Sequence, residues 1–211
     1  MRRSVYESPA ERRARHAVIE DPAEVLTAAA RFLEARPRST DEVRHRLREA
    51  GYRADLVEAA LLRLTELGFL DDAGFARTWV ESRDRARPRG VRALRDELRR
   101  MGVAAADIEG ALAAREAVAS GDDPGDPRLV PADGERAASG ASDAAAAARL
   151  LARKGAGLMR EPDLRKRRAR AYAMLARAGC DPGTAGQASA AWLQAARTAP
   201  MDDEADQLPD P

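Results

Sequence analysis

The sequence predicts an all-α protein built as an elongated tandem array of three-helix repeats. Its 211 residues are rich in Ala, Leu, Arg and Glu, and aromatic residues make up only 4%. This composition favours helices along almost the whole chain. A pattern of helix caps, apolar positions and turns also recurs at a shift of 51 residues, which is typical of stacked copies of one supersecondary unit.

The first repeat is expected at residues 21–68. Asp21 before a proline predicts the N-cap of a first helix. Ser39 and Glu42 have the spacing of a capping box and predict the start of a second helix, which ends at Gly51, a residue type suited to the left-handed position after a helix. A third apolar run follows and completes the unit.

The second repeat is expected at residues 69–118, with Phe69, Leu70 and Phe75 near its boundary with the first. The shift of 51 residues aligns equivalent cap, core and turn positions: Arg44 with Arg95, Leu47 with Leu98, Gly51 with Gly102, and Glu58 with Glu109. A weaker third repeat is expected at residues 144–197. Its last helix has mostly alanine to bury before Trp192.

The remaining segments are expected to lack stable structure. They are a flexible N-terminal segment (1–20), an acidic Gly/Pro-rich flexible insertion (119–143) and an acidic disordered tail (198–211). Such compositions bury too little apolar surface to fold on their own.

Charge is unevenly distributed, although the formal net charge is only +1. Residues 77–100 hold nine arginines and four acids, a local charge of +5, and residues 149–177 hold ten Lys or Arg and two acids, a local charge of +8. The two basic segments therefore suggest surfaces that bind an acidic partner or phosphates.

Several classes of function are disfavoured. The single cysteine, Cys180, and two histidines offer no recognised metal-ligand spacing. No glycine-rich phosphate loop follows a strand, and no nucleophile has a partner base by motif, so we expect neither catalysis nor a cofactor. Without an apolar run of about 18 residues or a signal-peptide pattern, we expect a cytoplasmic monomer with no membrane contact.

Residues 26–112 resemble the RecX family of bacterial regulatory proteins, and residues 144–195 do so more weakly. The motifs that carry the resemblance are "ARPRSTDEVRHRLREAG", "LTELGFLDDAGFARTWVESR" and "RPRGVRALRDELRRMGV". The resemblance implies tandem three-helix repeats and a partner, the RecA recombinase, bound as a filament on single-stranded DNA. It also implies that the chain modulates RecA in recombination, DNA repair and the SOS response, mainly by inhibiting its ATPase and strand-exchange activities. The long acidic insertion departs from the family pattern.

Two sets of basic residues are our candidates for binding the RecA filament or a phosphate backbone. The first surrounds a Pro-Gly turn, where like charges repel unless a partner compensates them. A solvated helix face is an alternative interpretation, and nonspecific DNA binding by helix-turn-helix-like units is a second one. The candidates are Arg83, Arg85, Arg87, Arg89, Arg92 and Arg95, followed by Arg165, Lys166, Arg167 and Arg168.

Overall fold

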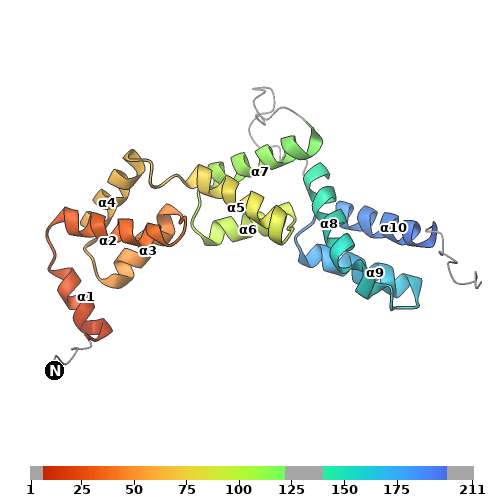
Figure 1. Cartoon of the computed structure of the whole chain (residues 1–211), viewed down its shortest axis with the longest axis horizontal. Coiled ribbons are helices and arrows are strands. Elements are labelled where there is room, and N and C mark those ends of the chain that lie inside the picture. The colour runs from red at the N-terminus through yellow and green to blue at the C-terminus, as the bar shows by residue number, and fades with distance from the viewer. Residues whose placement is uncertain (1–6, 122–139, 199–211) are drawn as a thin grey trace, which may run out of the picture. The chain divides into compact units, whose positions relative to one another are not determined.

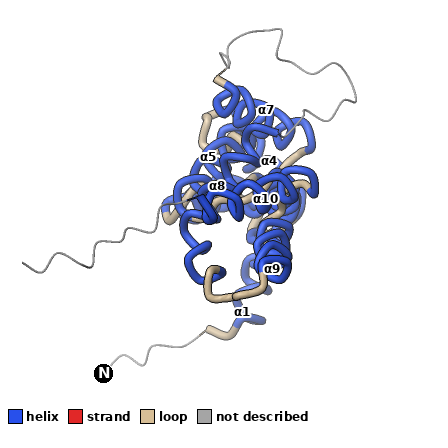
Figure 2. The backbone as a smooth tube through the Cα atoms, turned by 90° about the vertical axis from the view of Figure 1, so that its right-hand side faces the viewer, coloured by secondary structure: helices blue, strands red, loops and turns tan. Residues whose placement is uncertain are grey.

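The computed structural model describes residues 7–121 and 140–198 and confirms the all-α prediction. Helices joined by short loops account for these residues, without a strand among them (Figures 1 and 2). The helices are α1 (Pro9–Ala17), α2 (Pro22–Glu34), α3 (Thr40–Ala50), α4 (Ala54–Glu66), α5 (Asp72–Ala86), α6 (Val91–Arg100), α7 (Ala105–Ser120), α8 (Gly140–Leu158), α9 (Leu164–Arg177) and α10 (Pro182–Thr198).

The helices form two compact units. The first unit contains α1–α5, α7 and the part of α6 from Leu94 onward, whereas the second contains the segment Pro88–Ala93 together with α8–α10. The three repeats are α2–α4, α5–α7 and α8–α10, and each has a first, a second and a third helix in that order. The flexible insertion and the acidic tail predicted from the sequence lie mostly outside the described residues, although residues 119–121 and 140–143 are described and residues 140–143 belong to α8.

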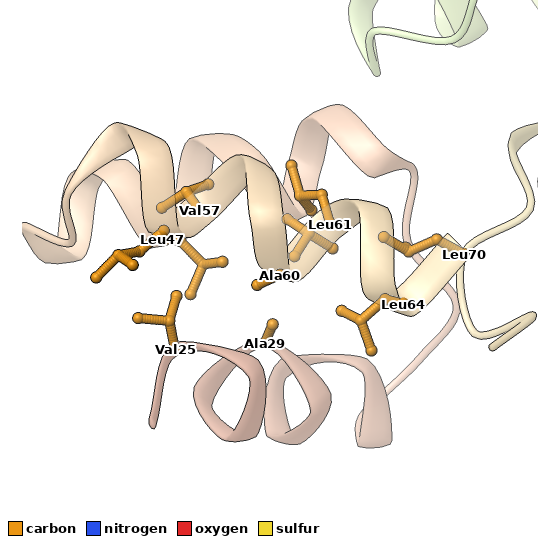
Figure 3. Packing of buried hydrophobic residues seen from close by; sticks show 10 residues of the cluster. Val25, Ala29, Leu47, Val57, Ala60, Leu61, Leu64 and Leu70 are labelled. Carbon is orange, nitrogen blue, oxygen red and sulfur yellow. The ribbon is translucent and has the colours of Figure 1, made fainter. Parts of the chain in front are cut away.

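The first repeat buries its apolar residues between its own three helices. Val25 and Ala29 of α2 face Ala60 and Leu64 of α4, and Leu47 of α3 packs in the same cluster (Figure 3). All five side chains are at most 3% exposed. Burying each large aliphatic side chain contributes about 1.5–3 kcal/mol, which offsets the conformational entropy lost on folding.

The other two repeats bury apolar residues at corresponding helical positions. In the second repeat, Leu94 and Leu98 of α6 and Ile108 of α7 are at most 1% exposed. The third repeat buries Leu175 of α9 and Ala185 of α10, both at 0%. The apolar spacing in the sequence therefore corresponds to a separate core in each repeat.

The predicted helix ends are present in the first repeat. The hydroxyl of Ser39 accepts a hydrogen bond from the N–H of Glu42, and the Glu42 side chain accepts one from the N–H of Ser39. Asp21 accepts a hydrogen bond from the N–H of Ala23 and so caps α2. Gly51 ends α3 at a φ of 101°, a conformation that costs glycine little because it has no Cβ atom.

The helix α1 was not expected, because we assigned the N-terminal segment to flexible chain. Ser8 and Glu11 form a capping box at its start. At its other end, Nδ1 of His16 donates a hydrogen bond of 2.7 Å to the carbonyl of Ala50, and the His16 ring stacks on Tyr52 at 4.3 Å between centroids. These contacts join residues more than 30 positions apart, so local composition could not reveal them.

The first two repeats meet at the N terminus of α3. The N–H of Thr40 donates a hydrogen bond of 2.8 Å to the carboxylate of Asp72 on α5, and the hydroxyl of Ser39 donates one to the carbonyl of Met101. A Cβ atom on Gly102, the next residue, would collide with Asp41. The second repeat therefore supplies both a cap and a close-packed backbone to a helix of the first.

The same contacts occur in the second unit. The N–H of Val91 donates a hydrogen bond of 2.8 Å to Asp143 on α8, and the N–H of Gly90 donates one of 2.9 Å to the carbonyl of Ala178. A Cβ atom on Gly179 would collide with Ala93. Both boundaries between consecutive repeats thus use the same kind of contact, which we call the joint. In each joint, the later repeat supplies a left-handed glycine, the carbonyl before it, and a carboxylate from its first helix.

Helix α1 contacts the first repeat at the equivalent position. A Cβ atom on Gly51 would lie 2.7 Å from the carbonyl oxygen of Arg13 in α1. In all three repeats the carbonyl before the left-handed glycine accepts a hydrogen bond from the preceding element: Ala50 from His16, Met101 from Ser39, and Ala178 from Gly90. Helix α1 therefore covers the edge that the other two repeats use in a joint.

Candidate partner-binding surface

Two arginines of the first candidate set are held by ion pairs. Nε of Arg83 lies 2.7 Å from Glu97, and its guanidinium stacks on the Trp79 ring at 4.2 Å from the centroid. Arg95 binds the carboxylate of Glu109 through two hydrogen bonds of 2.7 and 2.8 Å. These geometries show that Arg83 and Arg95 stabilise the second repeat internally.

The other arginines of this set differ in exposure. Arg85 is exposed, with an ion pair to Glu81 at 3.8 Å, and Arg89 is half-buried. Arg87 and Arg92 are exposed, and in the described part of the chain their side chains form no ion pair. Arg87 and Arg92 are therefore the members of this set that are best placed to bind an external partner.

The ion pair between Arg95 and Glu109 repeats an ion pair in the first repeat. Nε of Arg44 lies 3.0 Å from Glu58, and the two pairs are related by the shift of 51 residues. Hydrogen bonding to Arg44 holds the pKa of Glu58 below its ordinary value, and Arg95 lowers the pKa of Glu109 in the same way. Each pair joins the second helix of its repeat to the third.

These lowered pKa values predict a loss of stability in acid. A carboxylate whose pKa is lower in the folded chain stabilises it above the unfolded pKa, about 4.3 for Glu, and stops doing so as the pH falls through the folded pKa. We expect Glu58→Gln and Glu109→Gln each to cost about 0.5 kcal/mol at pH 7, because these pairs are partly exposed and screened. Urea unfolding between pH 7 and 3 should show the difference from wild type disappearing below about pH 4.

The control for this series is Glu20→Gln. Glu20 is exposed and forms no ion pair within the described residues, so its replacement should not change the pH dependence. A constant difference between wild type and the Glu109 variant down to pH 3 would contradict the role assigned to the ion pair.

A buried ion pair that the sequence pattern did not reveal fixes α5 to α7. Arg115 donates two hydrogen bonds of 2.8 Å to the carboxylate of Asp84, and its side chain is only 5% exposed. The partners are 31 residues apart, so no local motif joins them. Asp84 therefore neutralises an arginine that is buried between α5 and α7.

The second candidate set lies on α9. Asp163 caps this helix by accepting hydrogen bonds from the N–H groups of Arg165 and Lys166. Nε of Arg167 donates a hydrogen bond of 2.8 Å to the carbonyl of Glu161. The side chains of Arg165, Lys166 and Arg168 are exposed and form no ion pair within the described residues. Three of the four predicted cations are thus open to a partner.

Residues 7–121 and 140–198 contain no group of three or more His, Cys, Asp or Glu side chains placed to hold a metal ion. Cys180 is buried at 1% exposure. No helix in the described ranges has the length and apolar character needed to cross a lipid bilayer.

Comparison with known proteins gives matches to the RecX family. Residues 26–64 match the family description "RecX, first three-helix domain", and residues 71–112 match "RecX, second three-helix domain". "Regulatory protein RecX" of Mycolicibacterium vanbaalenii is 45% identical over 87 residues, which are 41% of this chain and 47% of that protein. The protein of the same name from Prosthecochloris aestuarii is 40% identical over 83 residues, which are 39% of this chain and 55% of that protein.

Solved structures extend the similarity of fold to the third repeat. The crystal structure of RecX from Lactobacillus salivarius matches with a TM-score of 0.59 at 16% identity, over 82% of this chain and 97% of that one. Another structure, of "regulatory protein RecX", matches with a TM-score of 0.55 at 19% identity, over 77% and 68%. The sequence matches span about half the length of the curated relatives. Residues 26–112 thus contain two consecutive three-helix domains that match, in order, those of the RecX family of regulatory proteins.

Proposed function

We propose that this protein binds a filament of the RecA recombinase on single-stranded DNA and lowers its ATP hydrolysis and strand exchange. The observation that carries the proposal is the ordered match of both repeats to RecX three-helix domains. The relatives are named regulatory proteins, and RecA is the partner that the family resemblance implies. We assign the protein a binding role in the cytoplasm, as a monomer, with no catalytic step and no cofactor.

The arrangement of repeats supports a binding role of this kind. Consecutive repeats linked by the joint present equivalent surfaces along one chain, so several weak contacts can act together. A filament of identical protomers offers equivalent sites at regular intervals, which suits such an array. Arg87 and Arg92 are the exposed cations of the first candidate set that we place at this contact.

Nonspecific DNA binding is the alternative function. Exposed arginines on three-helix units could neutralise phosphates and give a steep salt dependence. Sequence-specific reading is disfavoured because the chain has no Asn, and its Gln residues, at 187, 194 and 207, lie outside the first two repeats. Binding to RecA filaments, compared with binding to bare duplex DNA, separates the two functions.

The test compares two double variants that change the net charge equally. Arg87→Glu with Arg92→Glu reverses two exposed cations of the proposed contact, whereas Arg31→Glu with Arg100→Glu reverses two exposed cations elsewhere. We expect the first variant to bind RecA filaments about tenfold more weakly and to inhibit the RecA ATPase less, while the second resembles wild type. Co-sedimentation with filaments formed on single-stranded DNA with ATP, and the ATPase rate, are the measurements.

Two results would contradict the proposal in different ways. Equal inhibition by the first variant and wild type would remove Arg87 and Arg92 from the contact. Tight binding of wild type to bare duplex DNA, with no binding to RecA filaments, would replace the proposed function with the DNA-binding alternative. Circular dichroism of all variants should show unchanged helix content, because none of the four side chains is buried.

A further inference from the structure

The third repeat contains a groove between α9 and α10. Its volume is about 440 Å³, and its lining residues are Arg165, Arg168, Ala169, Tyr172, Gly186 and Ser189. The first four have the spacing of one face of α9, and the last two belong to α10. A Cβ atom on Gly186 would have no neighbour within 4 Å, so the backbone leaves this part of the groove open.

The groove has an uncompensated positive charge. Arg165 and Arg168 are exposed and form no ion pair in the described parts of the chain. The sequence of α9 contains no acid, and both nearby carboxylates already have partners. Asp163 caps the helix, and Glu161 lies 2.9 Å from Arg170. An anion that enters the groove would therefore meet two guanidinium groups without displacing a protein carboxylate.

The groove also contains an aromatic ring. Tyr172 is 38% exposed, and it lies one helical turn beyond Arg168 on the same face of α9. Guanidinium groups form paired hydrogen bonds with phosphate oxygens, and exposed aromatic rings stack on nucleic-acid bases without regard to sequence. An acidic peptide could bind the two arginines, but it has no base to stack on the ring.

One cation of the groove, Arg165, lies in an extension that the other repeats lack. Thr40 and Val91, the first residues of α3 and α6, each precede their left-handed glycine by 11 positions, at Gly51 and Gly102. In α9, by contrast, Leu164 precedes Gly179 by 15 positions. The second helix of the third repeat is thus one turn longer at its N terminus, and Arg165 lies in that added turn.

From these observations we infer that the groove binds single-stranded nucleic acid, with Arg165 and Arg168 on the phosphates and Tyr172 stacked on a base. The inference rests on the proposed function for the origin of the strand, which is the single-stranded DNA of the filament. It extends that function by giving the third repeat a nucleic-acid contact of its own.

The test uses the full chain without RecA. Fluorescence anisotropy with a labelled oligothymidylate of about 12 nucleotides measures binding across a salt titration. We expect Arg165→Ala with Arg168→Ala to weaken binding at least tenfold and to reduce the slope of log K against log salt by about 1.4, the value for two phosphate contacts with a single strand. Tyr172→Ala should weaken binding about tenfold without changing the slope, and Tyr172→Phe should resemble wild type.

The control removes the same charge elsewhere in the second unit. Lys154 and Arg177 are exposed and have no ion pair within the described residues, so Lys154→Ala with Arg177→Ala should leave both affinity and slope close to wild type. The slope falls for the arginine variant and stays unchanged for the Tyr172 variant, and this difference separates stacking from charge. A purely structural role for these residues would not produce that difference.

Three results would overturn the inference. The first is that wild type does not bind the oligonucleotide at low salt. The second is that wild type and the double arginine variant bind it equally. The third is that poly-aspartate competes as well as unlabelled oligothymidylate and that Tyr172→Ala has no effect. The last would assign the groove to an acidic peptide. If the protein fails this test but binds RecA filaments, only the assignment of the groove is wrong. If it passes this test but does not bind RecA filaments, the proposed function is wrong.

Discussion

Replacing Asp143 with alanine is expected to lower the free energy of unfolding of the second unit by about 3 kcal/mol. The Asp143 side chain is 0% exposed, and its two carboxylate oxygens accept hydrogen bonds from the N–H groups of Val91 at 2.8 Å and Asp181 at 2.9 Å. Removing the carboxylate leaves both amides without this partner, and each buried unsatisfied group costs about 1–3 kcal/mol. Urea unfolding, followed by the fluorescence of Trp192 in α10, measures the change.

The matched control is Asp163→Ala, which removes the exposed cap of α9. Water can replace that carboxylate, so the expected cost is about 1 kcal/mol. Asp143→Asn should fall between the two, because the amide keeps one acceptor oxygen. Equal losses for the alanine variants at 143 and 163 would show that the buried cap has no special role in the joint.

Gly102→Ala should destabilise the first unit by about 3 kcal/mol. Gly102 has a φ of 75°, where an L-residue with a Cβ atom costs about 1–2 kcal/mol. Its new methyl group would also collide with the side chain of Asp41, and displacing a packed neighbour adds about 1–3 kcal/mol. Thermal unfolding measures the sum of the two costs.

Gly68→Ala separates the two costs of the Gly102 substitution. Gly68 has the same φ of 75°, but a Cβ atom there would have no neighbour within 4 Å. It should therefore show the conformational cost alone, about 1 kcal/mol. If both variants lost the same stability, the close approach of Gly102 to the first repeat would contribute nothing.

The sequence predicted the features that depend on neighbouring residues. The capping box at Ser39 and the left-handed Gly51 are set by side chains within one helical turn, and both are present. The repeat itself was visible because equivalent positions face equivalent cores. These local and periodic signals were sufficient to predict the fold class.

Contacts between distant residues could not be predicted in this way. Asp72 lies in the first turn of α5, but its carboxylate accepts a hydrogen bond from Thr40, 32 residues away. Asp143 was counted with the acidic insertion, although it is buried in a joint. Of the neighbouring apolar residues Phe69 and Leu70, the first is 67% exposed and the second is 2% exposed.

The candidate surface was predicted by charge alone, which does not show how each arginine is paired. Composition gave a local excess of cations, but it could not show that Arg95 binds Glu109 on another helix while Arg92 lies exposed. The part of Tyr172 in a groove depends on the position of α10, which supplies Gly186 and Ser189. The choice among the arginines therefore required the three-dimensional packing.

The helix α1 has a consequence for the behaviour of the protein at high concentration. Head-to-tail contacts generate open polymers when they occur between molecules. His16 and Arg13 occupy the Ala50–Gly51 edge within the same molecule, where their effective concentration exceeds that of any competing chain. The Ala50–Gly51 edge is thus covered within the molecule and is closed to a second copy of the chain.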